Sequence, residues 1–157
     1  MERFSDSEAT RAHRYYSAHC FNSAWELIRK QDRTPLEDLL MATMSQASLY
    51  HWIHRPDCTD RNLSIGYWQA SRVHSLLGIA HEAKRFAEIC REFSGELDPF
   101  YQGYAEEALA RAEWVAGNLD AARAHARKAS AHAEAVKEAD DRARLLQDLA
   151  LFLDSPA

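Results

Sequence analysis

The spacing of apolar residues constrains the fold of this chain more than any other feature. Apolar side chains recur three and four positions apart through long stretches, and most of the Gly and Pro residues stand between these stretches. Such spacing is typical of amphipathic helices joined by turns. No segment shows the alternating pattern of a strand, and residues 101–157 contain no Ile and no Thr. The sequence therefore predicts an all-α fold.

Breaks in this pattern predict seven helices in a single domain. Thr34 followed by Pro35 is a start signal for the second helix, and Gly78 is a stop signal for the third. Because every connection is short, consecutive helices should be antiparallel neighbours. The predicted segments are three hairpins over about 7–54, 61–93 and 100–138, and a capping helix over about 141–153.

The apolar stripes of the first two helices are expected to face the core. In the first helix this stripe consists of Tyr15, Tyr16, Phe21, Trp25 and Ile28. In the second helix it consists of Leu36, Leu39, Leu40, Met44, Ala47 and Tyr50.

Charge and composition exclude several classes of partner. The chain has 19 Lys and Arg residues against 24 Asp and Glu, so it has no basic excess for nucleic acid or an anionic membrane. No stretch approaches the roughly 18 to 20 apolar residues of a membrane span, and the first residues lack the apolar core of a secretory signal. Three widely spaced cysteines are expected to be reduced thiols. We therefore expect a cytoplasmic protein that binds neither nucleic acid nor membrane.

An internal repeat relates two of the predicted hairpins at an offset of 39 residues. Small residues hold most of the repeated positions, which lets two helices approach closely, and a Gly supplies the reversal between them. The first set is Ala70, Ser71, His74, Gly78, Ala83, Ala87 and Cys90; the second is Leu109, Ala110, Glu113, Gly117, Ala122, Ala126 and Ala129.

This spacing resembles the tetratricopeptide repeat, in which a Leu and a small residue open the pattern, a Gly marks the turn and three Ala-like positions follow. The resemblance covers about residues 64–134, with a degenerate first hairpin. Two departures are the offset, which exceeds the usual repeat of about 34 residues, and Glu113 at the usual aromatic site. The resemblance implies a right-handed superhelix whose hairpins form a concave groove.

Proteins that this chain resembles use the groove to bind a protein or peptide, so the resemblance implies a non-catalytic interaction module without a cofactor. It places Trp68 and Glu107 at one equivalent groove position, Arg72 and Arg111 at another, and Ile65 and Tyr104 at a third. Arginine forks match carboxylates, which favours an acidic ligand. The structural alternative is that Arg72 and Glu107 satisfy each other as an ion pair.

Two further hypotheses remain open at this point. A small-molecule- or metal-dependent enzyme could use His51 and His54, which lie one helical turn apart, although no known metal-ligand signature occurs and we expect no bound metal. Alternatively, a homodimer would cover apolar residues near the ends of the array by symmetric pairing. The residues expected near those ends are Phe4, Tyr15, Tyr16 and Phe152.

Overall fold

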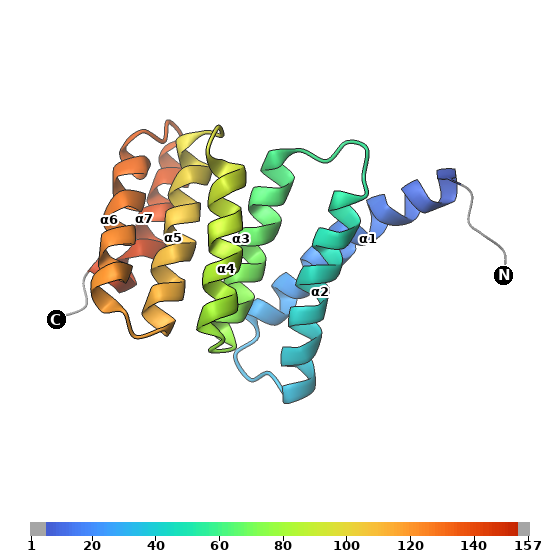
Figure 1. The fold of residues 1–157 in the computed structure, drawn as a ribbon, viewed down its shortest axis with the longest axis horizontal. Coiled ribbons are helices and arrows are strands. Elements are labelled where there is room, and N and C mark those ends of the chain that lie inside the picture. The colour runs from blue at the N-terminus through green and yellow to red at the C-terminus, as the bar shows by residue number, and fades with distance from the viewer. Residues whose placement is uncertain (1–5, 154–157) are drawn as a thin grey trace.

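The computed structural model describes residues 6–153, which form seven α-helices and no strand (Figure 1). The helices are α1 (Asp6–Arg29), α2 (Pro35–Ile53), α3 (Asp60–Leu76), α4 (Ala80–Ser94), α5 (Pro99–Val115), α6 (Leu119–Glu134) and α7 (Ala139–Leu153). The all-α prediction is confirmed. None of these helices is long and apolar enough to cross a membrane.

One predicted boundary is wrong. Helix α6 ends at Glu134 rather than near Glu138, and the backbone N–H of Ala135 closes it by bonding to carbonyl oxygens of the last turn. The reason is Val136, which is buried and only 6% exposed. The chain leaves the helix to bury this side chain, and the Ala-rich pattern around it gives no sign of the change.

Consecutive helices pack as neighbours, most closely within the pairs α1 with α2, α3 with α4, and α5 with α6. Helix α3 also packs on α5, and α5 packs on α7, so the hairpins stand side by side (Figure 1). Helix α1 touches α3 at few positions, and the first hairpin is attached to the rest mainly through α2. The first hairpin is therefore the least engaged layer of the stack.

The repeated positions are equivalent in the two inner hairpins. Every repeated position other than the glycines is buried in both hairpins. Gly78 and Gly117 adopt φ angles of 72° and 82°, and the residue after each donates its N–H to the carbonyl oxygen five positions earlier, at 2.9 Å. This left-handed cap favours glycine because a Cβ atom would be strained there. The 39-residue repeat thus corresponds to two hairpins with matching turns.

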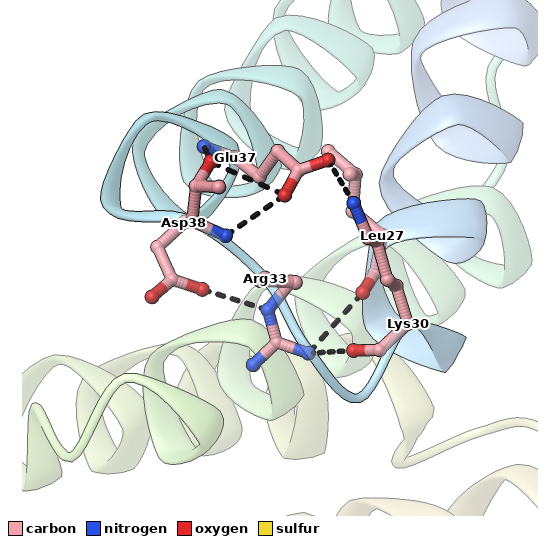
Figure 2. Close-up of polar contacts among 6 residues, drawn as sticks. Leu27, Lys30, Arg33, Glu37 and Asp38 are labelled. Atoms are coloured by element: carbon pink, nitrogen blue, oxygen red, sulfur yellow. Dashed lines mark hydrogen bonds and ion pairs between the residues drawn. The ribbon is translucent and has the colours of Figure 1, made fainter.

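The turn between α1 and α2 is built differently, from side chains (Figure 2). Nη1 of Arg33 donates to the carbonyl oxygens of Leu27 at 3.2 Å and Lys30 at 2.6 Å. Its Nε donates to Oδ1 of Asp38 at 2.7 Å. Thr34 caps α2 through a capping box. One arginine therefore ties the end of α1 to the start of α2 without a left-handed glycine.

The predicted buried stripes of α1 and α2 are wrong in part. Tyr15 is 62% exposed, and Leu36, Leu39 and Tyr50 are 74%, 67% and 56% exposed. The buried residues of α2 are instead Met41, Ser45, Ser48 and Leu49.

Serines explain this difference between prediction and structure. The Ser48 hydroxyl donates to the backbone oxygen of Ser17 at 2.8 Å, and both residues are fully buried. Small hydroxyl side chains let α1 and α2 approach closely, but they do not contribute to an apolar period. The face that packs is consequently the one that looks polar in the sequence.

The two ends of the stack also differ from expectation. Phe152 is fully buried, in a cluster with Leu145, Leu149 and alanines of α5 and α6. Phe4 lies outside the described residues. Helix α7 therefore seals one end with a well-packed apolar face.

Candidate functional site

A groove of about 1110 Å³ lies between the last turns of α1, the helices α3 and α5, and the segment from Ala135 into α7. Its lining combines five aromatic residues with charged residues of both signs. The aromatic residues are Trp25, Trp68, Phe100, Tyr101 and Tyr104.

The five aromatic rings form one continuous strip. Ring centroids are 5.5 Å apart between Trp25 and Trp68, and 5.4 Å between Trp68 and Tyr104. The strip continues from Tyr104 to Phe100 at 5.0 Å and from Phe100 to Tyr101 at 5.3 Å. Three helices contribute to it: α1, α3 and α5. The groove therefore offers a run of ring edges and faces, which we name the aromatic strip.

Two arginines border the ends of the aromatic strip. The guanidinium carbon of Arg29 lies 5.6 Å from the centroid of the Trp25 ring, and that of Arg61 lies 5.3 Å from the centroid of the Tyr101 ring. Both residues are exposed. Neither forms an ion pair with any residue in the described part of the chain. Their positive charge is available to an anionic group placed over the rings.

Trp68 is fixed from behind by a buried carboxylate. Its Nε1 donates to Oε2 of Glu107 at 2.9 Å, and Nε of Arg111 donates to Oε1 of the same carboxylate at 2.9 Å. Glu107 is only 1% exposed. Glu107 and Arg111, both predicted as groove residues, do not line the groove. The structure places them behind Trp68, where they hold the indole in position.

Arg72 also lies away from the groove lining. The predicted ion pair between Arg72 and Glu107 does not form, because the Glu107 carboxylate bonds to Trp68 and Arg111. Nε of Arg72 is buried without a hydrogen-bond partner among residues 6–153. Burial lowers the pKa of its guanidinium, and the nearby charge of Arg111 lowers this pKa further.

Tyr104 is held by α7. Its hydroxyl donates to Oδ2 of Asp148 at 2.9 Å. Burial, followed by the negative charge of Asp148, raises the pKa of the phenol well above its ordinary value. The phenol therefore stays neutral and keeps donating to the carboxylate. Of the residues predicted at the three groove positions, Ile65, Trp68 and Tyr104 line the groove.

Several lining residues were not predicted from the sequence, among them Arg29, Arg61, Phe100 and Tyr101. A usable signal was present in the Phe-Tyr-x-x-Tyr run at the start of α5, which places three aromatic residues within one and a half turns. The contribution of α1 was harder to predict, because it depends on the rotation of that helix about its axis.

Cys90 is the one cysteine among the residues that line the groove. The thiol donates to the backbone oxygen of Ser64 at 3.3 Å, and burial raises its pKa to about 12. A protonated thiol is a poor nucleophile at neutral pH. All three cysteines are free, and burial also raises the pKa of the Cys20 and Cys58 thiols.

The predicted histidine site lies outside the groove, between α1 and α2. The two Nδ1 atoms of His13 and His51 are 2.9 Å apart, and the ring of His54 stacks on His13 with centroids 5.1 Å apart. Burial, followed by the charges of His13 and His54, lowers the pKa of His51. Within residues 6–153, no group of three or more His, Cys, Asp or Glu side chains is arranged to hold a metal ion.

The fold and the groove together define an all-α protein of stacked helical hairpins with an aromatic strip along one groove. Comparison with protein-family models, with curated proteins and with solved structures finds no match to this chain.

Proposed function

We propose that this protein is a non-catalytic interaction module that binds an extended peptide segment of a partner protein in the groove. The observation that carries the proposal is the aromatic strip, bordered by Arg29 and Arg61, neither of which has an ion-pair partner within the described chain.

The chemistry of the lining suggests the kind of peptide. Aromatic side chains offer large, rigid apolar surfaces on which apolar side chains of a ligand can stack. Guanidinium groups bind carboxylates through paired, charge-assisted hydrogen bonds. We infer that the bound segment carries aromatic or aliphatic side chains together with at least one carboxylate.

The groove is also arranged to bind without much reorganisation. Glu107 fixes the indole of Trp68, and Asp148 fixes the phenol of Tyr104. Immobilising a flexible side chain on binding costs on the order of 0.5–1.5 kcal/mol. Rings that are already held avoid much of this cost, which supports a binding role for the aromatic strip.

The matching turns and burial of the two inner hairpins support a tetratricopeptide-like classification, and this is part of the proposal. In such arrays the first helices of successive hairpins line the binding groove. Here α3 and α5 contribute most of the aromatic strip. The three free cysteines support placing the protein in a reducing compartment such as the cytoplasm.

The test is selection of binding peptides from a random-peptide display library on the immobilised protein. We expect enrichment of peptides that combine aromatic residues with Asp or Glu. Substituting both arginines that border the aromatic strip, Arg29→Gln and Arg61→Gln, should lower the affinity for a selected peptide by roughly tenfold or more. The reason is that hydrogen bonds to charged groups contribute about 1.5–3 kcal/mol each.

A matched control removes two exposed charges from α6, through Arg127→Gln and Lys128→Gln. Affinity should then stay within about twofold of the wild type, and melting temperatures should show that both variants fold. The proposal is contradicted when no peptide is enriched, or when loss of Arg29 and Arg61 leaves the affinity unchanged.

A further inference from the structure

The outer face of α2 carries large apolar side chains and almost no charge. Leu36, Leu39, Leu40 and Tyr50 expose between 42% and 74% of their surface, on the side opposite the buried Met41. Residues 39–54 include no Asp, Glu, Lys or Arg. A helix face with this composition is unusual on a protein surface, where charged residues normally cover the solvent side.

The exposed apolar surface continues from α2 onto α1 through a chain of rings. Centroids are 5.3 Å apart between Tyr50 and His51, 5.4 Å between His51 and Tyr16, and 5.0 Å between Tyr16 and Tyr15. Tyr15 and Tyr16 are 62% and 45% exposed. We define the end face as these two tyrosines together with Leu36, Leu39, Leu40 and Tyr50.

The end face is large enough to form an interface. A large side chain carries on the order of 200 Å² of accessible surface, so six side chains that are about half exposed present on the order of 700 Å². The largest apolar patch of a typical monomer covers about 300–600 Å². A standard interface buries about 800 Å² of each partner. The end face thus approaches the area that a stable dimer requires.

The position of the end face in the fold also indicates an interface. Each inner hairpin buries its apolar face against the next layer, and at the far end α7 buries Leu145, Leu149 and Phe152. In the described part of the chain, no layer covers the outer side of α2. Stacked hairpins need terminal layers with polar outer faces to remain soluble alone. The outer side of α2 does not meet this requirement.

We propose that a second copy of this chain covers the end face, in a two-fold symmetric dimer. A two-fold axis brings the same surface of both copies together, so every charge near the axis would meet a like charge. The uncharged run over 39–54 avoids this repulsion. Where the end face meets the start of α2, the charges are already compensated, because Lys30 pairs with Glu37 and Arg33 pairs with Asp38. A charged partner would find no complementary charge on residues 39–54 of this face.

The test is sedimentation velocity of the full chain over a range of concentrations. We expect a species of twice the chain mass at tens of micromolar. The variant Leu36→Lys with Leu39→Lys should sediment as a monomer with an unchanged helical circular-dichroism spectrum, because both side chains are exposed. The control variant Leu76→Lys with Leu146→Lys should still dimerise, since these two leucines are each 42% exposed but lie on α3 and α7.

Two outcomes would overturn the dimer. One is a wild-type monomer at every concentration, and a monomer that instead floats with phosphatidylcholine vesicles would assign the end face to a lipid surface. The other is a wild-type dimer that the two lysines on α2 leave intact, which would place the interface elsewhere. Neither outcome bears on peptide binding, because the end face and the groove share no residue.

Discussion

At the scale of single residues, the groove depends on polar partners that stand behind its rings. Glu107 is the clearest case, since it is 1% exposed and accepts from both Trp68 and Arg111. The spacing of 39 residues between Trp68 and Glu107 makes them equivalent repeat positions, and the structure shows that these positions bond to each other. The sequence suggested Glu107 as a ligand-binding residue, but in the structure its carboxylate holds the indole of Trp68 in position.

Removing the indole donor should be costly. In Trp68→Phe the Oε2 atom of Glu107 loses its donor while remaining buried, and an unsatisfied buried acceptor costs about 1–3 kcal/mol. We expect a loss of that size in the free energy of unfolding, measured with urea.

The matched control for this measurement is Trp114→Phe. The half-buried indole of Trp114 packs on the ring of Phe152, with centroids 5.8 Å apart, and makes no hydrogen bond within the described chain. Its substitution should cost less than that of Trp68. Equal losses in the two variants would show that the bond to Glu107 contributes nothing.

The histidine cluster predicts a dependence of stability on pH. Folding lowers the pKa of His51 from its ordinary value of 6.5, so the unfolded chain binds more protons as the pH falls below that value. The groups that face His51 are His13, Tyr16, Tyr50 and His54. The part of the free energy of unfolding that depends on neutral His51 should therefore be fully present at about pH 7.5. It should decline as the pH falls through the range just below 6.5.

Melting temperatures measured from about pH 7.5 to 5.5 test this prediction. The variant His51→Gln should lose less of its melting temperature on acidification than the wild type does. His81→Gln is the matched control, since the His81 side chain is 81% exposed and pairs with its neighbour Glu82. A wild-type slope that His51→Gln does not reduce would contradict the assignment.

At the scale of elements, the turns determine how the helices pair. The two inner hairpins reverse at glycines with positive φ, whereas Arg33 holds the first turn through three hydrogen bonds. The glycine turns could be predicted from the sequence, because Gly at the end of an apolar period is a specific signal. The role of Arg33 could not, because an arginine in a loop gives no indication of which carbonyls it will reach.

Substituting a turn glycine should be destabilising only where φ is positive. We expect Gly117→Ala to cost about 1–2 kcal/mol, because its φ of 82° strains any residue with a Cβ atom. An added Cβ would meet no heavy atom within 4 Å apart from those of its chain neighbours, so the cost comes from the backbone conformation. Gly95→Ala is the matched control. Gly95 has a φ of −54°, and an added Cβ would meet only a backbone oxygen at 3.6 Å.

Urea denaturation of both glycine variants provides the measurement. The control should stay within about 0.5 kcal/mol of the wild type, as expected for a surface change without strain. A Gly117→Ala protein as stable as Gly95→Ala would mean that the positive φ does not constrain this turn.

The buried faces of the helices were harder to predict than their boundaries. In α2 the leucines at 36 and 39 form an apolar stripe, yet the structure buries Ser45 and Ser48 on the opposite side. Hydrophobic periodicity assumes that the larger apolar face is the buried one. That assumption fails in α2 for two reasons. The close contact with α1 requires small side chains, and the larger apolar face stays exposed.

At the scale of the whole molecule, the two proposed surfaces lie on different parts of the stack. The groove is formed mainly by α3, α5 and α7, and the end face by α1 and α2. Trp68 and Tyr104, which the resemblance to the tetratricopeptide repeat suggested as binding residues, line the groove. The contributions of Trp25 and of the connection between α6 and α7 could not be predicted from the repeat. They depend on how α1 and α7 pack against the two repeated hairpins.

The most direct test of the account is an NMR titration of the ¹⁵N-labelled protein with a display-selected acidic peptide. The chain has four tryptophans, and each indole N–H gives a separate signal. Trp25 and Trp68 line the groove, whereas Trp52 lies under the guanidinium of Arg55 and Trp114 packs on Phe152. Peptide binding in the groove predicts that the Trp25 and Trp68 signals shift and the other two do not. Shifts confined to Trp52 or Trp114 would contradict the account.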